Sequence, residues 1–248
     1  MKIFQSCIWQ INSTLVEGSE DCFLFDPAYF PHEIEQIKKS LPDKRLNLVF
    51  THGDWDHIAG FSEFSHGSTI GHYKITERKE QFKKAQDFDL KWYVERNKAL
   101  EYPRIDRKID DETIIATSDD SLLFLPIPGH APDMMATFFL DRKLVIAGDV
   151  LSDKEFPFVL YSCNEYILSL EKMKRKIKEY DIHSLIPGHG KPIFNSQLEI
   201  IERIETDLDY LYQLKSGNIT GYYRQQPIPS HLKAYHEANI KLYEANKW

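Results

Sequence analysis

The sequence is poor in cysteine and has no hydrophobic run of membrane-spanning length. Only three cysteines occur among 248 residues, Cys7, Cys22 and Cys163, and none belongs to a CxxC pair. This argues against a disulfide framework and suits a reducing compartment. No apolar run approaches the roughly 20 residues of a transmembrane helix. The N-terminal segment MKIFQSCIWQINST also lacks a cleavable signal pattern, because polar residues interrupt its apolar ones. We therefore expect a cytoplasmic protein without membrane association.

Positive charge is in short supply as well. The chain has 31 lysine and arginine residues against 38 aspartate and glutamate residues, a net charge of −7. This balance disfavours general nucleic-acid binding, which depends on clustered basic charge. We expect a small-molecule substrate instead. Aromatic residues in 82–93 and 210–223 could serve a homodimer interface. Repeats, low-complexity segments and Pro/Gly/Ser linkers are absent, so we expect one domain over residues 1–248.

The apolar periodicity predicts a mixed α/β fold. Strand patterns occupy residues 2–10, 13–18, 22–27, 46–50, 113–119, 121–130, 136–150 and 182–190. Helix patterns occupy residues 31–41, 166–180, 196–214 and 230–248, and a charged segment, 73–98, reads as mostly helical. Strands follow one another as well as alternating with helices, which indicates two facing sheets covered by helices. The core should reach about residue 193, with a helical extension over about 195–248.

Potential metal ligands gather where the apolar strands end. The segment HGDWDH (52–57) follows LNLVF, and His130, Asp149 and His189 each end a further apolar run, directly after a glycine. Glycine permits tight turns that aim the next side chain, and loops held by rigid strands often carry catalytic groups. Two imidazoles and two carboxylates within six residues would repel or stay exposed unless a cation held them. A metal site is therefore favoured over a solvated acidic turn.

The motifs HGDWDH, PGHAPD, AGDV and IPGHG follow one another as in a known family. Up to about residue 193, the chain resembles the metallo-β-lactamase-fold, glyoxalase II-like metallo-hydrolases, whose signature is His-x-His-x-Asp-His, then His, a bridging Asp and a last His. The resemblance implies an αββα sandwich with a dinuclear metal site at one edge of its sheets. It also implies the ligands: His52, Asp54 and His130 for the first metal, Asp56, His57 and His189 for the second, and Asp149 between them, together with a water or hydroxide.

Asp54 departs from this family pattern, which usually has histidine there. Three carboxylates and one hydroxide would balance two divalent ions, so the centre would be formally neutral, whereas a histidine at position 54 would leave one positive charge. An additional hard oxygen ligand shifts preference towards manganese or iron. Zinc also accepts carboxylate oxygen readily. We expect two divalent metal ions, with Zn²⁺ as the first candidate and Mn²⁺ or Fe as alternatives.

The resemblance implies a hydrolase that uses hydroxide held between two metals to cleave a carboxylic ester, thioester, lactone or phosphodiester. Asp56 and Asp149 would be the catalytic residues besides ligating metal, and the sequence has no GxSxG nucleophile elbow. An iron-dependent redox enzyme on the same scaffold is the alternative. A non-catalytic metal-binding member is a weaker one, because all seven ligand positions hold ligating side chains.

Substrate contacts are harder to predict than metal ligands. The candidates are Lys154, Tyr161, Tyr223, Arg224 and Trp92. Segment 73–98 is too charged for the core, yet its aromatic residues need an apolar surface. We expect a helical flap over the rim of the metal site, with Trp92 or a neighbouring aromatic residue against the substrate. A helix packed on the outer layer, far from the metals, is the alternative. Asp133 could orient a ligand or lie exposed in its turn.

Overall fold

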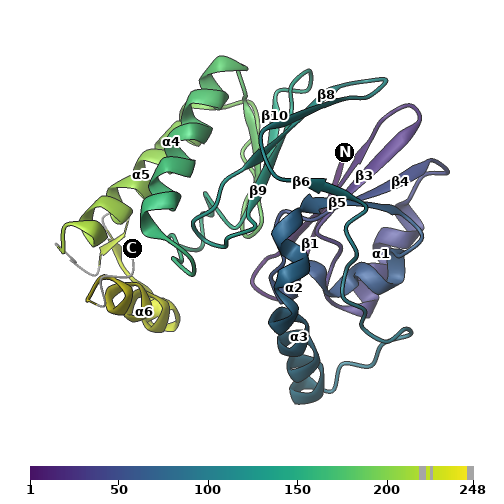
Figure 1. The fold of residues 1–248 in the computed structure, drawn as a ribbon, viewed down its shortest axis with the longest axis horizontal. Helices are drawn as coiled ribbons and strands as arrows, with labels where there is room; N and C mark the ends of the chain where they lie inside the picture. The colour runs from purple at the N-terminus through teal and green to yellow at the C-terminus, as the bar shows by residue number, and fades with distance from the viewer. Residues whose placement is uncertain (218–221, 224–225, 245–248) are drawn as a thin grey trace.

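Two β-sheets face each other at the centre of the fold (Figure 1). The structure is a computed structural model and describes residues 1–217, 222–223 and 226–244. The first sheet has the order β1 (Lys2–Gln5), β2 (Asn12–Glu17), β3 (Asp21–Phe25), β4 (Arg45–Val49), β5 (Ser68–His72) and β6 (Arg107–Ile109). The second has the order β11 (Ser184–Pro187), β10 (Leu144–Gly148), β9 (Met135–Phe139), β8 (Ser121–Pro126) and β7 (Thr113–Ala116). Strands β3 to β6 pair in parallel, as do β10 and β11.

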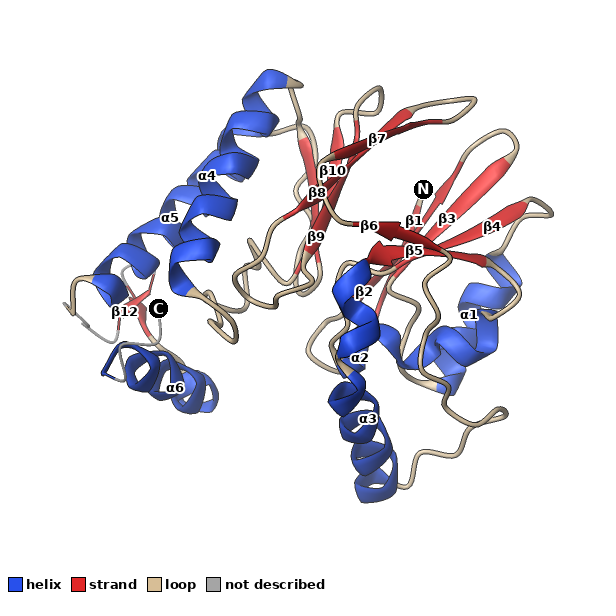
Figure 2. Ribbon diagram, in the orientation of Figure 1, coloured by secondary structure: helices blue, strands red, loops and turns tan. Residues whose placement is uncertain are grey.

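Helices cover the outer face of each sheet (Figure 2). On the side of the first sheet lie α1 (Pro31–Ser40), α2 (Trp55–Ile58) and α3 (Lys79–Trp92). On the side of the second lie α4 (Cys163–Glu179) and α5 (Gln197–Lys215), and α6 (Lys233–Glu244) packs near α5. The remaining short elements are the 3₁₀ helices Ala59–Phe64, Tyr73–Glu77 and Ser230–Leu232, and the ribbon β12 (Tyr222–Tyr223) and β13 (Gln226–Pro227). The αββα sandwich expected from the sequence is confirmed.

Three apolar layers hold the sandwich together. Between the sheets, Phe25 of β3 packs against Phe139 of β9, with ring centroids 5.9 Å apart. Outside the first sheet, Ile34 and Ile37 form the apolar stripe of α1 and are almost fully buried. The faces of α4 and α5 bury a larger cluster against the second sheet. Burial of a side chain such as Ile37 contributes about 2 kcal/mol, so these layers set the positions of the strand ends.

The structure differs from the predicted elements in several places. The apolar run 136–150 is two strands, β9 and β10, because the turn between them includes Lys143 in the left-handed region at φ 55°. Strands β5 and β6 were not predicted. Segment 73–98 contains one 3₁₀ helix and α3, and is not helical after Trp92. No helix in the described ranges combines the length and the apolar character that a membrane crossing needs.

Candidate metal centre

The seven predicted metal ligands converge at one edge of the sandwich. His52 follows β4. Asp54 is the N-cap of the short helix α2, and Asp56 and His57 lie within that helix. His130, Asp149 and His189 follow β8, β10 and β11 of the second sheet. Each half of the sandwich therefore supplies part of one site, and its imidazoles are all almost completely buried.

The ligand atoms fall into two groups of three. Within each group, one atom per residue lies within 4.8 Å of the others: His52, Asp54 and His130 form the first group, and Asp56, His57 and His189 form the second. Two such groups, side by side, have the size of two coordination shells that provide nitrogen and oxygen donors.

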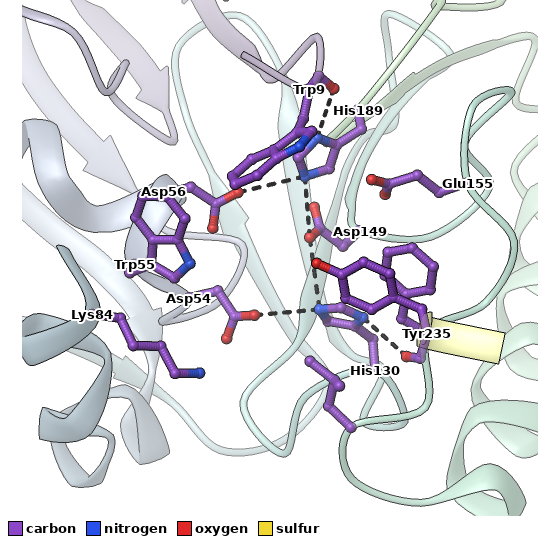
Figure 3. A pocket seen from close by; sticks show the side chains of 12 residues that line it. Trp9, Asp54, Trp55, Asp56, Lys84, His130, Asp149, Glu155, His189 and Tyr235 are labelled. Atoms are coloured by element: carbon purple, nitrogen blue, oxygen red, sulfur yellow. Dashed lines mark hydrogen bonds and ion pairs between the residues drawn. The ribbon is translucent and has the colours of Figure 1, made fainter. Parts of the chain in front are cut away.

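Asp149 lies between the two groups (Figure 3). Its Oδ1 is 3.0 Å from Nε2 of His57, and its Oδ2 is 3.5 Å from Nε2 of His52. The same Oδ2 lies 3.3 Å from Nε2 of His189 and 3.6 Å from Nε2 of His130. A carboxylate in contact with both groups is placed to bridge two cations.

Glycine is required where β10 and β11 approach the site. Gly148 has φ 63°, and a Cβ atom there would lie 2.9 Å from the Thr51 side chain. At Gly188, a Cβ atom would lie 2.2 Å from Oδ1 of Asp149. Any side chain at position 188 would thus displace the central carboxylate, which explains why GD and GH pairs end these strands.

Each histidine points Nε2 into the site because an outer group holds its Nδ1. The partners of Nδ1 are Oγ1 of Thr51 for His52 at 3.0 Å, Oδ2 of Asp26 for His57 at 3.0 Å, the carbonyl of Phe158 for His130 at 3.0 Å and the carbonyl of Trp9 for His189 at 2.9 Å. Such outer hydrogen bonds fix the ring orientation and the tautomer of metal-binding histidines. Asp26 was not among the residues predicted from the sequence. A sequence signal for Asp26 does exist: like the candidate ligands, it follows the end of an apolar strand, β3.

The site concentrates opposite charges in a buried volume. Burial by itself would lower the pKa of His189, but the Asp149 carboxylate outweighs it and raises the pKa to about 10. Burial would raise the pKa of Asp54, yet His52, His130 and Arg78 hold it well below its usual range. Without a metal, the carboxylates raise the pKa values of His57, His130 and His189, so protons on these imidazoles supply the positive charge that the carboxylates need.

Two buried histidine nitrogens without hydrogen-bond partners indicate that the site suits divalent metal ions. Nε2 of His52 and Nε2 of His130 are buried and have no hydrogen-bond partner among the described residues. Such orphaned atoms are costly unless something binds them. Both point towards the carboxylates, and mixed imidazole and carboxylate donors suit zinc, manganese or iron. The seven side chains could hold two ions, with Asp149 shared.

The Arg78 side chain, which is 11% exposed, contacts Asp54, the candidate ligand that departs from the family pattern. The Arg78 guanidinium forms an ion pair with Oδ1 of Asp54 at 2.5 Å and another with Oδ1 of Asp133 at 2.7 Å. Asp133 is fully buried, and its Oδ2 accepts a hydrogen bond from the backbone NH of Gly53 at 2.8 Å. Of the two possibilities for Asp133, the structure thus shows the buried one, behind the ligand loop. Sequence reasoning missed Arg78, which lies among many charged residues.

A cavity of about 230 Å³ opens onto the metal ligands (Figure 3). Besides the ligands, its wall consists of Trp9, Trp55, Lys84, Glu155, Phe158, Leu160 and Tyr235. Most of this wall is apolar, with Lys84 near Asp54 and Glu155 on the opposite side. Burial raises the pKa of Glu155, against the opposing charge of His189. None of these seven residues was predicted to contact substrate.

Three of the predicted substrate contacts, Lys154, Tyr161 and Trp92, do not line this cavity. Lys154 pairs with Asp153 at 3.7 Å, and the exposed Tyr161 ring lies 5.8 Å from Nζ of Lys74. Neither residue lines the cavity, and Trp92 does not either. Tyr223 belongs to β12, whereas Arg224 lies outside the described residues.

Segment 73–98 does border the site, in a different manner from the expected flap. Arg78 reaches Asp54, and Lys84 of α3 lines the cavity. The Phe88 ring packs against the Trp55 ring, with centroids 4.8 Å apart, and Trp92 remains 60% exposed at the end of the helix. The alternative of a helix far from the ligands is therefore excluded, but the helix presents a lysine to the cavity and not Trp92.

Comparison with known proteins assigns the family. The metallo-beta-lactamase superfamily pattern matches residues 8–189, a range that contains all seven candidate ligands. The chain belongs to the metallo-beta-lactamase superfamily. A curated relative, "Probable metallo-hydrolase YqgX" from Bacillus subtilis (strain 168), is 27% identical over 184 residues, which are 73% of this chain and 85% of the relative.

Solved structures share the fold of this chain. The metallo-beta-lactamase family protein TTHA1429 from Thermus thermophilus has a TM-score of 0.64 and 17% identity, over 87% of this chain and 80% of that one. TTHA1623, solved in a di-iron-bound form, has a TM-score of 0.60 and 19% identity, over 78% of this chain and 94% of that one. At these identities, the likeness concerns the fold alone.

Proposed function

We propose that the protein is a hydrolase of ester-type bonds that uses two divalent metal ions, with Zn²⁺ as the first candidate. The observation that carries the proposal is the pair of three-residue ligand groups joined by Asp149 on the floor of one cavity. Membership of the metallo-beta-lactamase superfamily and the similarity to a probable metallo-hydrolase support it. The bonds considered are those of carboxylic esters, thioesters, lactones and phosphodiesters.

Bound divalent ions supply a water that loses its proton near neutral pH and a positive charge that polarises the substrate oxygen. The protein's own residues do the rest. Asp56 and Asp149 hold the charge of the centre and can accept a hydrogen bond from the attacking water. Glu155 faces the ligands across the cavity, where a carboxyl group can exchange a proton with a leaving oxygen or sulfur.

The cavity wall indicates what kind of substrate would fit. Trp9, Trp55 and Tyr235 offer aromatic surface for an apolar group. Lys84 adds a positive charge on the side of Asp54. A small ester with an apolar portion and an anionic group matches both features, and the volume of about 230 Å³ excludes a polymer from entering whole.

The test combines metal analysis with a substrate panel. We expect about two metal ions per chain in purified protein and turnover of at least one ester, thioester, lactone or phosphodiester. His130→Ala and His189→Ala should each lose one ion and nearly all activity, because each removes one ligand from a different group. His183→Ala is the matched control, since this histidine lies exposed and outside both groups.

Three outcomes would contradict the proposal. Full activity with unchanged metal content in either ligand variant would remove the site assignment. Bound iron together with oxygen consumption, and no ester turnover, would favour the iron-dependent redox alternative. Protein that binds no metal at all would indicate a non-catalytic member.

A further inference from the structure

The ion pair between Arg78 and Asp54 changes the charge of the candidate metal centre. With three carboxylates and one hydroxide, the centre was expected to be formally neutral. Arg78 adds one positive charge in direct contact with one of those carboxylates, at 2.5 Å. Both side chains are about nine-tenths buried, with 11% and 12% exposure, so water screens this charge little.

Arg78 also determines which Asp54 oxygen is available. Oδ1 contacts the guanidinium, whereas Oδ2 faces the other ligands of its group, 3.5 Å from Nε2 of His130 and 3.8 Å from Nε2 of His52. One oxygen of the carboxylate is therefore held away from the centre. Asp54 presents a single donor atom, as an imidazole ring would.

Asp133 holds the Arg78 side chain in position. Asp133 is fully buried, binds the guanidinium at 2.7 Å and accepts the Gly53 NH at 2.8 Å. Arg78 does not line the cavity, so it is not placed to bind substrate. Its contacts lead to the ligand Asp54 and to the loop that carries this ligand.

We propose that Asp54 and Arg78 act as one unit that takes the place of a neutral histidine: the unit offers one donor atom and no net charge to the ligand shell, and Asp133, the second partner of Arg78, lies outside that shell. Arg78 is then a positioning residue that sets the net charge of the ligand shell and keeps Asp54 a one-oxygen ligand. The inference rests on the two-metal site of the proposed function, although not on any particular substrate.

The proposal predicts whether zinc affinity rises or falls, relative to the wild type, in two single variants and in the double variant. Removing the positive charge in Arg78→Met makes the shell more negative, so Zn²⁺ should bind at least about tenfold more tightly. Removing the negative charge in Asp54→His leaves the arginine beside a cation, so Zn²⁺ should bind at least about tenfold more weakly. The double variant restores the original charge and should stay within about threefold of the wild type.

A structural role for Arg78 predicts a different order. If Arg78 only fastened the ligand loop to α3, both Arg78→Met and the double variant would bind zinc more weakly, and Asp54→His would change little. Arg96→Met is the matched control for loss of a buried arginine in this segment. Its side chain is 8% exposed and pairs with Asp89, and the residue belongs to no ligand group.

Zinc affinity is measured by competition with a chromogenic chelator at fixed pH and salt, after thermal unfolding of each metal-free variant has confirmed folding. If Arg78→Met does not fold, Arg78→Gln removes the charge with smaller loss of hydrogen bonding and must give the same order. Weaker zinc binding in the Arg78 variant, or unchanged binding in Asp54→His, overturns the inference. Wild-type protein that binds no zinc or other divalent ion would instead overturn the metal centre of the proposed function, and the inference with it.

Discussion

Asp26 lies behind the candidate metal ligands and forms hydrogen bonds with both Thr51 and His57. Its carboxylate accepts hydrogen bonds from the backbone NH and the hydroxyl of Thr51, at 2.8 and 2.7 Å, and contacts Nδ1 of His57 at 3.0 Å. Asp26 is 2% exposed and has φ 46°, an unusual value for a residue other than glycine. The surrounding structure therefore imposes this conformation, as is common at functional sites.

Asp26→Asn should weaken zinc binding by about 10- to 100-fold, the usual range for an outer hydrogen-bond partner. An amide has only one accepting oxygen, so its NH₂ group must face either Thr51 NH or His57 Nδ1–H. If it faces His57, the ring proton moves to Nε2, where the metal would bind. Chelator competition measures the loss. Asp120→Asn is the control, because Asp120 is a buried carboxylate that belongs to neither ligand group. Equal losses in both variants would contradict the assigned role of Asp26.

The ligands and their supporting residues differ in how far the sequence reveals them. The convergence of His130, Asp149 and His189 could be predicted, because each ends an apolar strand after a glycine. Arg78 and Lys84 could not, because they lie in a segment full of charged residues. Which of those charges becomes buried depends on how α3 docks, and this is set by tertiary contacts that no local pattern encodes.

An arginine at each end of α3 anchors this helix to the rest of the fold. Arg78 precedes the helix and binds the ligand loop, and Arg96 follows it and binds Asp89 at 2.5 Å and the Tyr29 carbonyl at 2.8 Å. Between them, Phe88 packs on Tyr29 with ring centroids 5.1 Å apart. The helical pattern of this segment was predictable, but the face that packs was not. Phe88 packs on Tyr29 and Trp55 of the first half of the sandwich, whereas Trp92 stays 60% exposed.

Asp89→Asn should lower the free energy of unfolding by about 3 kcal/mol, because it leaves the Arg96 charge buried without its carboxylate. Urea denaturation of the metal-free protein measures this change. Asp87→Asn is the matched control on the same helix, since its pair with Lys83 is more than half exposed and should contribute below about 1 kcal/mol. Similar losses from the two substitutions would show that the Asp89 pair does not fasten the helix.

For the whole molecule, the candidate centre joins the two halves of the sandwich. The first sheet and α2 provide His52, Asp54, Asp56 and His57, and the second sheet provides His130, Asp149 and His189. In the metal-free protein, His57 from the first half and Asp149 from the second form an ion pair at 3.0 Å, and the carboxylates raise the pKa of this imidazole. Metal ions and protons therefore compete for one set of donors, and both link the halves.

This competition predicts the direction in which the stability of the metal-free protein changes with pH. The pKa of His189 is raised to about 10 in the metal-free fold, above its ordinary value of about 6.5 in an unfolded chain. A raised pKa stabilises the fold fully below the unfolded value, and this stabilisation is lost as pH rises through the folded value. The metal-free protein should thus lose stability between about pH 6.5 and about pH 10. Zinc requires neutral imidazoles, so its binding strengthens over the same range.

We therefore expect the gap in Tm between zinc-loaded and metal-free protein to widen as pH rises from about 6.5 to about 9. Calorimetry of both forms at several pH values measures it. His189→Ala should make the metal-free Tm less dependent on pH, because it removes a titrating imidazole from the ion pairs around Asp149. His183→Ala should leave the dependence unchanged, since this side chain is 42% exposed and outside the ligand groups. A metal-free Tm that stays constant over this range would show that protons on His189 do not stabilise the metal-free fold.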